Sequence, residues 1–213
     1  IFRLGQKKIA RYIATQMARH RFHAPLLWVT TPEQVHLLDL LDYGGLVYDC
    51  DREWDDLPSA WEGALASSAD VVFAVSQGIA DRLAPCSGNI ALLPNGATYP
   101  LFAQASPPLW ERPSRHGIPT LGWAGTIHAD LDLTPVFIAA RAHPEWRFQL
   151  LGRREQNPLL KPLSRMANLS FLPPCPLSEV PSHLARCQVL LNLLREGEQG
   201  SDIVPTRMYE YLS

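Results

Sequence analysis

The stretch "SAWEGALASSADVVFAVSQGIADRLA", residues 59–84, decides the fold class. Its middle, "DVVFAVS", is a short apolar run bounded by polar residues, which is typical of a buried strand. The segments on either side have helical spacing. A strand between two helices is the repeating unit of a parallel sheet that is buried on both faces. The stretch therefore predicts an α/β fold.

The same alternation extends on both sides of this stretch. Upstream, a helix is predicted from about Leu4 to Arg21, with Ile9, Ile13 and Met17 on one stripe. A strand "PLLWVT", a helix "EQVHLLDLL" and a strand "GLVYDC" follow it. Downstream, "NIALLPNG" predicts a strand and a turn.

The alternation of strands and helices stops at residues 99–119, "YPLFAQASPPLWERPSRHGIP". This segment has no clear period and predicts a domain boundary. The alternation restarts with "TLGWAGT", "LTPVFIAARA", "WRFQLLG", "NPLLKPLSRM", "NLSFLPP", "LSEVPSHLARC" and "QVLLNLL". We therefore predict two Rossmann-like domains with parallel sheets, residues 1–108 and 109–213. Such sheets bind ligands at the carboxyl ends of their strands, and we expect the cleft between the halves to hold the ligand.

The composition excludes several other classes of protein. The chain has 213 residues with a net charge of −2, which gives no case for nucleic-acid binding. No apolar run approaches the roughly 20 residues of a membrane span. Its four cysteines are scattered without a Cys-x-x-Cys pair. We therefore expect free thiols, no zinc or disulfide framework, and a cytoplasmic location.

The closing stretch "DIVPTRMYEYLS", residues 202–213, predicts an anion site. Pro205 suits the start of a helix, where its missing N–H costs nothing. A helix N-terminus favours anions, and Arg207 adds a fixed positive charge one turn in. The expected ligand is a phosphate with a further group attached.

These segments together resemble a known family. "ADVVFAVSQGIADRL", "ALLPNGATYPLF", "LGWAGTI", "WRFQLLG" and "PTRMYEYLS" occur in the order and spacing of retaining, group 1 (family 4-like) GT-B glycosyltransferases, closest to a bacterial surface-polysaccharide branch. The resemblance implies transfer of a sugar from a nucleotide-diphosphate-sugar to a glycan or lipid-linked acceptor. The family's opening glycine-rich loop and its strand after Glu-Tyr-Leu do not occur here, so we expect both domains to be partial.

The resemblance also assigns roles near the nucleotide sugar. Glu210 matches the glutamate that holds the ribose diol, with a solvated helix glutamate as the alternative. Arg207 matches a diphosphate contact that is usually Lys, with a surface arginine as the alternative. Asp202 matches a catalytic-side carboxylate near the donor sugar, although the family has Glu there. A loop aspartate that caps a turn remains the alternative for Asp202.

Further candidates follow two strands of the second half. Gly125 would let the backbone approach a phosphate, and Thr126 can donate a hydroxyl. His128 could contact the donor as a catalytic-side residue, or be an ordinary loop histidine. Arg153 offers a cation at the end of a strand, with a solvated loop arginine as the alternative. Asp132 is expected to cap the next helix.

The acceptor-side candidates are Asp51 and Glu53, in the run "YDCDREWDD". Crowded acids after a strand could bind acceptor hydroxyls, or be a solvated loop. They do not form a clear metal site. We expect no metal and no cofactor, because cations and a helix terminus can neutralise a diphosphate.

The beginning of the chain is basic, and its first acid is Glu33. A basic amphipathic helix can lie on an anionic membrane surface, which would suit a lipid-linked acceptor at the inner face of the membrane. The alternative is an outer helix whose basic face is exposed to solvent. The cations are Arg3, Lys7, Lys8, Arg11, Arg19 and Arg21.

Two other functions remain open at this point. One is a nucleotide-sugar epimerase of the same fold, which needs no acceptor. The other is a non-catalytic GT-B module that binds or scaffolds, because Asp202 and Arg207 depart from the family pattern.

Overall fold

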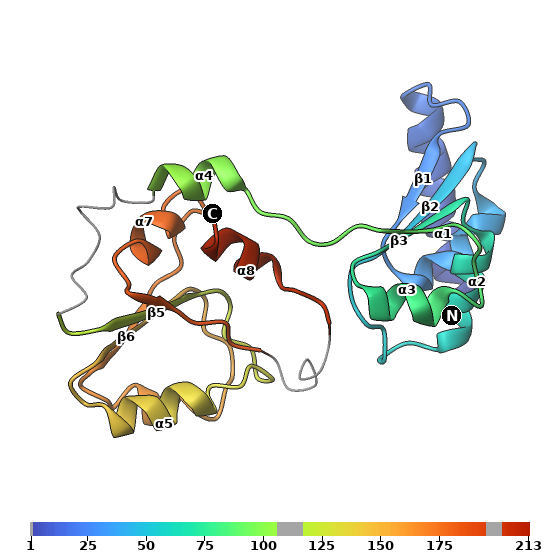
Figure 1. Cartoon of the computed structure of the whole chain (residues 1–213). Coiled ribbons are helices and arrows are strands. Elements are labelled where there is room, and N and C mark those ends of the chain that lie inside the picture. The colour runs from blue at the N-terminus through green and yellow to red at the C-terminus, as the bar shows by residue number, and fades with distance from the viewer. Residues whose placement is uncertain (1, 106–116, 195–201) are drawn as a thin grey trace. The chain divides into compact units, whose positions relative to one another are not determined.

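The computed structural model describes residues 2–105, 117–194 and 202–213, and Figure 1 shows their course. The chain folds into two compact units. The first unit runs to Asn95 and also includes Asp202–Val204, whereas the second begins at Gly96 and includes Pro205–Ser213. Each unit contains a four-stranded parallel sheet, which confirms the predicted α/β class.

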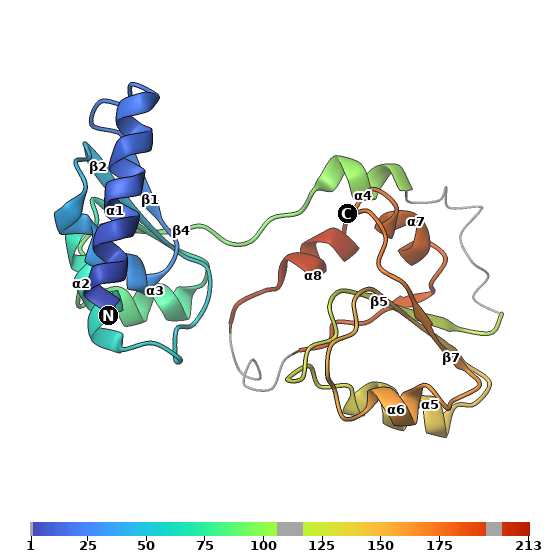
Figure 2. The ribbon, with the colours of Figure 1, turned by 180° about the vertical axis from the view of Figure 1, so that it is seen from behind.

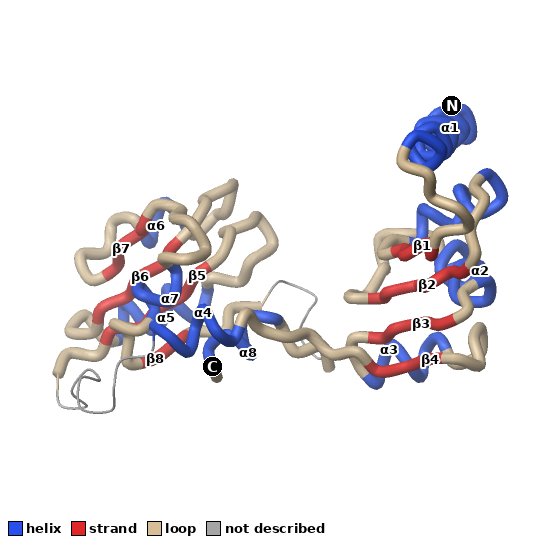
Figure 3. Tube along the Cα trace, turned by 90° about the horizontal axis from the view of Figure 1, so that it is seen from above, coloured by secondary structure: helices blue, strands red, loops and turns tan. Residues whose placement is uncertain are grey.

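The first unit has the sheet order β1-β2-β3-β4. Its strands are β1 (Leu26–Val29), β2 (Gly45–Cys50), β3 (Val71–Ala74) and β4 (Ile90–Leu92). Its helices are α1 (Phe2–Arg19), the 3₁₀ helix η1 (Pro32–Leu40), α2 (Ser59–Ser68) and α3 (Gln77–Leu83). All neighbouring strands are parallel, and they lie side by side in Figure 3.

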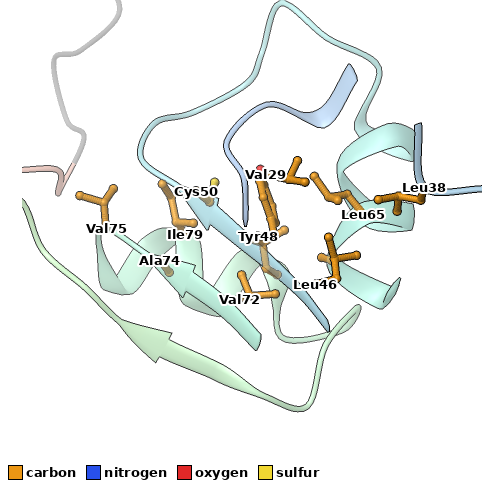
Figure 4. Packing of buried hydrophobic residues seen from close by; sticks show 12 residues of the cluster. Val29, Leu38, Leu46, Tyr48, Cys50, Leu65, Val72, Ala74, Val75 and Ile79 are labelled. Atoms are coloured by element: carbon orange, nitrogen blue, oxygen red, sulfur yellow. The ribbon is translucent and has the colours of Figure 1, made fainter. Parts of the chain in front are cut away.

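Alternating residues of the central strands build the core of this unit. Leu46, Tyr48 and Cys50 of β2 are buried against helix residues such as Leu65 and Ile79 (Figure 4). Each fully buried large apolar side chain contributes about 1.5–3 kcal/mol relative to exposure. The run "GLVYDC" is a strand because its inward residues reach this core.

The first helix, α1, packs against η1 and is seen along its length in Figure 2. Ala10 is buried, whereas Ile9 and Tyr12 are 49% and 67% exposed. Ile13 and Met17 of the predicted stripe are partly buried, whereas Ile9 is exposed. The stripe therefore coincides only in part with the buried face of α1. Its outer face carries apolar as well as basic side chains.

The second unit has the sheet order β7-β6-β5-β8, again parallel. Its strands are β5 (Thr120–Ala124), β6 (Arg147–Leu151), β7 (Leu169–Leu172) and β8 (Val189–Leu190). Helices α5 (Thr134–Ala142) and α6 (Leu160–Leu163) cover one face of the sheet. The opposite face carries α4 (Tyr99–Ala105), α7 (Val180–Leu184) and α8 (Thr206–Tyr211), as Figures 1 and 2 show.

Helix α4 differs from the sequence expectation, which gave residues 99–119 no element of their own. Phe102 is only 7% exposed, and α4 packs against α7 and α8. These contacts make Tyr99–Ala105 part of the second unit, which begins at Gly96. The remainder of the predicted linker, residues 106–116, lies outside the described residues.

Candidate functional site

The loops that leave β5 and β6 are joined at the carboxyl edge of the second sheet. The Gly125 N–H donates to the Leu151 carbonyl over 3.0 Å, and the Ile127 N–H donates to the Arg153 carbonyl over 2.8 Å. Gly152 has φ of +135°, and a Cβ atom there would collide with the Gly125 carbonyl oxygen. Both loops therefore depend on glycine at position 152, and they bring Thr126 and Arg153 to the same edge.

Arg207 reaches this edge from the first turn of α8. Its Nε donates to the Ala124 carbonyl and its Nη1 to the Leu193 carbonyl, each over 3.2 Å. Its guanidinium carbon lies 5.0 Å from the centre of the Trp123 ring, within the range of a cation–π contact. Neutral partners thus hold this cation, and within the described residues it forms no ion pair.

Gly125 lies directly against the Arg207 side chain. A Cβ atom at position 125 would come within 3.1 Å of Arg207 Nη2 and 2.8 Å of Trp123 Cζ2. The absence of a side chain leaves the Gly125 backbone beside the one amino group of Arg207 that has no hydrogen-bond partner in the described part of the chain. A backbone and a fixed cation in this arrangement suit an anionic oxygen.

Glu210 lies three residues after Arg207 on α8. Burial raises the pKa of Glu210, and the Arg207 cation opposes that rise. A carboxylate one helical turn from a bound anion can accept hydrogen bonds from hydroxyl groups of the same ligand. Burial also raises the pKa of the neighbouring Tyr211 to about 12, so this phenol keeps its proton at neutral pH.

His128 and Thr126 lie in the loop that follows β5. His128 Nδ1 is 3.1 Å from Glu155 Oε2, so the two side chains from neighbouring loops contact each other. The Asn157 amide donates to the carbonyls of His128 and Leu131 over 2.8 and 3.0 Å. Asn157 therefore fixes the shape of this loop, while Arg153 is exposed.

An open hollow of about 430 Å³ lies beside this loop and is lined by Ala129–Thr134 and Asn157–Leu159. Of the candidate residues that the sequence suggested, only Asp132 lines this hollow. Its Oδ1 accepts the Thr134 N–H over 2.8 Å at the first residue of α5, although the N-cap residue of this helix is Leu133.

Asp202 belongs to the first unit. Its Oδ2 accepts the Gly78 N–H over 2.7 Å at the beginning of α3. The Gly78 N–H and then the Ser76 hydroxyl lower the pKa of Asp202. This contact corresponds to the capping alternative, and it gives the carboxylate a structural partner.

The acceptor-side candidates follow β2 in the first unit. Asp51 is exposed, whereas Glu53 Oε2 pairs with Arg82 Nη2 over 3.1 Å. Arg82 also pairs with Glu62, whose side chain is 6% exposed and accepts the Tyr48 hydroxyl over 3.0 Å. Glu53 is thus one end of a charge network.

Sequence reasoning missed three residues that organise these regions: Trp123, Asn157 and Glu62. Trp123 lies inside the quoted "LGWAGTI" segment, so its position was a usable signal. Asn157 and Glu62 act through partners more than a dozen residues away, and no local pattern marks such contacts.

No family model matches the sequence, and no curated protein matches it significantly. Among solved structures, sucrose-phosphate synthase from Thermosynechococcus elongatus is 15% identical with a TM-score of 0.65, over 86% of this chain and 53% of that one. A trehalose-6-phosphate synthase, studied for glycosyl transfer with retention, is 11% identical with a TM-score of 0.68, over 98% and 60%. Anabaena HepE in complex with UDP is 14% identical with a TM-score of 0.63, over 86% and 56%.

At these identities the likeness shows the fold alone. The fold is that of GT-B glycosyltransferases, with the two Rossmann-like units described above. The chain spans 53% and 60% of the lengths of the two synthase chains. Within the described residues, no helix is both long and apolar enough to cross a membrane.

Proposed function

We propose that the protein is a glycosyltransferase that moves a sugar from a nucleotide-diphosphate-sugar to a glycan or lipid-linked acceptor. The observation that carries this proposal is Arg207, a cation held by the Ala124 and Leu193 carbonyls beside the bare backbone of Gly125. A leaving diphosphate gains negative charge as the glycosidic bond breaks. A prepositioned cation stabilises that charge without reorganising.

Glu210 is proposed to hold the ribose diol, and Arg207 with the Gly125 backbone the diphosphate. Thr126, Arg153 and His128 lie on the loops of the same edge and are proposed to contact the donor. A uridine nucleotide is the first donor to test, because HepE of similar fold binds UDP. Retention of anomeric configuration is part of the proposal through the sequence resemblance. We also propose that no metal takes part in this transfer.

The test is a titration of the protein with UDP, GDP, ADP and TDP sugars, followed by product analysis with and without a saccharide acceptor. We expect one nucleotide class to bind and a new glycosidic bond to form only when acceptor is present. Conversion of the donor sugar without acceptor would indicate an epimerase instead. Failure of all four to bind would contradict the proposal.

A second candidate, a non-catalytic binding module, is favoured by the position of Asp202. Its carboxylate is engaged by the Gly78 backbone of the first unit. The same titration separates the two, because a module of this kind binds the nucleotide sugar and leaves it unchanged with every acceptor.

We further propose that α1 makes peripheral contact with an anionic membrane surface. Exposed Lys7, Lys8 and Arg11 share this helix with exposed Ile9 and Tyr12. Each cation near such a surface contributes up to about 1 kcal/mol, and the apolar side chains add buried area.

The protein is therefore expected to sediment with anionic liposomes and to be released at high salt. Changing Lys7, Lys8 and Arg11 to Glu should abolish sedimentation. Changing the exposed Lys161 and Arg165 of the second unit to Glu is the matched control and should not. Equal sedimentation of the α1 variant and the wild type would contradict the proposal.

A further inference from the structure

The connection between β7 and β8 brings a thiol, a carboxylate and an imidazole together. The ligand atoms of Cys175, Glu179 and His183 all lie within 4.8 Å of one another. Cys175 and His183 are partly buried, and Glu179 is exposed. We propose that these three residues form a binding site for a divalent transition metal, and that Zn²⁺ suits it best.

The backbone of this segment builds the cluster locally. The residues are spaced four apart, so Glu179 and His183 share one face of the helical turn. The Glu179 N–H donates to the Pro176 carbonyl over 2.9 Å, and the His183 N–H donates to the Glu179 carbonyl over 3.4 Å. These two hydrogen bonds extend the helical turns from His183 back to Pro176, the residue after Cys175. The three side chains therefore meet without any contact from a distant part of the chain.

The types of ligand select the metal. Thiolate and imidazole favour Zn²⁺ and its neighbours over Mg²⁺ and Ca²⁺, which prefer oxygen ligands. Metal–ligand bonds of about 2.0–2.3 Å require the three atoms to draw somewhat closer. Side-chain rotation at the exposed Glu179 and the partly buried Cys175 and His183 allows this. Three protein ligands leave a position for water or a further ligand.

The site lies outside the proposed nucleotide-binding edge but belongs to the same unit. Helix α7, which carries His183, packs against β5 and α4. An ion bound here would fix the β7–α7 connection and stabilise the second unit by mass action. The sequence predicted no zinc site because its cysteines lack a Cys-x-x-Cys pair, whereas this cluster combines a single cysteine with a glutamate and a histidine.

The test uses untagged protein with a reductant that is not a thiol. Co²⁺ titration should produce a thiolate-to-cobalt charge-transfer band, and Zn²⁺ should displace the Co²⁺. Cys175→Ser should remove the band and weaken binding at least tenfold. His183→Gln should weaken binding at least tenfold while the band persists at saturation. Glu179→Gln should weaken binding to a smaller degree.

The matched controls are Cys86→Ser, a partly buried cysteine of the first unit, and His143→Gln, a partly exposed histidine of the second. Both should bind Co²⁺ like the wild type. Zn²⁺ should raise the Tm of the wild type but not that of Cys175→Ser, and Mg²⁺ should raise neither. An unchanged band in Cys175→Ser, or its loss in Cys187→Ser with far-UV circular dichroism intact, would overturn the proposal.

Discussion

The two units use charge differently at the carboxyl ends of their sheets. In the first unit, Arg82 is shared between Glu53 and Glu62, and Arg52 pairs with Asp56. In the second, Arg207 is held by two backbone carbonyls and an aromatic ring. The arginines of the first unit are thus neutralised by carboxylates of the same unit. Arg207 of the second unit has no carboxylate partner within the described residues and keeps its positive charge.

This difference separates structural charge from charge that is available to a ligand. Burial of a carboxylate such as Glu62 costs free energy unless a cation and hydrogen-bond donors pair with it. Arg207 is positioned by dipoles, so an arriving anion displaces no carboxylate of the described residues from it. The same residue types thus form internal ion pairs in one unit, whereas in the other we propose that a cation binds an anionic ligand.

The largest expected effect concerns the first unit. Glu62→Gln removes the carboxylate that pairs with Arg82 and accepts the Tyr48 hydroxyl. Breaking a buried pair costs about 3–5 kcal/mol, but Arg82 is 38% exposed and can regain water. We expect a loss of about 2 kcal/mol in the free energy of unfolding, measured by urea denaturation.

Glu145→Gln is the matched control for Glu62→Gln, because Glu145 is exposed and its one ion pair within the described residues is with the partly exposed ring of His143. Its unfolding midpoint should equal that of the wild type. If Glu62→Gln behaved in the same way, the first unit would not depend on its internal charge pairing, and the contrast between the units would disappear.

The next effect concerns the retained charge of the second unit. Arg207→Ala would remove the proposed charge-assisted hydrogen bonds to the diphosphate, each worth about 1.5–3 kcal/mol. Nucleoside diphosphate binding should weaken at least about tenfold, which corresponds to about 1.4 kcal/mol. Binding of the free nucleoside should change much less, because it carries no phosphate charge. Isothermal titration calorimetry with both ligands measures the difference.

Arg154→Ala provides the comparison for Arg207→Ala, because Arg154 stacks over Phe171 at 5.4 Å and is not among the proposed donor contacts. Its diphosphate affinity should be close to that of the wild type. An equal loss in both variants would mean that general positive potential, and not the held guanidinium of Arg207, attracts the ligand.

Glu210→Ala should act on the other end of the nucleotide. Loss of the hydrogen bonds to the ribose diol should weaken nucleoside and nucleoside diphosphate alike, by roughly tenfold. The ratio of the two affinities should therefore stay constant, in contrast to Arg207→Ala. Binding of the 2′-deoxynucleotide should be less sensitive to this change, and calorimetry with the deoxy ligand checks it. Unaltered affinity would assign Glu210 to the helix surface.

Much of the fold could be predicted from local patterns. The run "GLVYDC" is β2 to the residue, because a continuous apolar run bounded by polar residues has few alternatives. Helix α4 was missed because Pro100 interrupts its short apolar pattern, and its stability comes from packing on α7 and α8. Helix α6 covers only Leu160–Leu163 of the predicted segment, in a stretch that contains Pro158 and Pro162.

The site was predictable where residues follow strands and not where distant partners decide the role. Gly125 and Arg153 were predicted at the ends of strands, and they lie there. The sequence could not show that Arg207 is held by the Ala124 carbonyl, 83 positions earlier. It also could not show that Asp202 lies with Gly78, 124 positions earlier. Roles set by such long-range contacts need the fold.

The smallest effect on stability is expected at Asp202, a carboxylate with a structural partner in the first unit. The dependence of Tm on pH tests whether this carboxylate is structural. Its folded pKa is lowered by the Gly78 N–H and the Ser76 hydroxyl, so its carboxylate stabilises the folded state above the unfolded pKa of about 3.9. This contribution is lost as the pH falls through the lowered folded pKa. Asp202→Asn should therefore have a slightly lower Tm than the wild type at neutral pH. The difference should begin to shrink near pH 4 and should vanish only below the lowered folded pKa. Asp55→Asn, an exposed loop variant of the first unit, should have the Tm of the wild type throughout this pH range. An Asp202→Asn variant with the wild-type Tm at neutral pH but no sugar transfer would instead make Asp202 a catalytic residue, as the family pattern suggests, and would show that this charge too is available to a ligand.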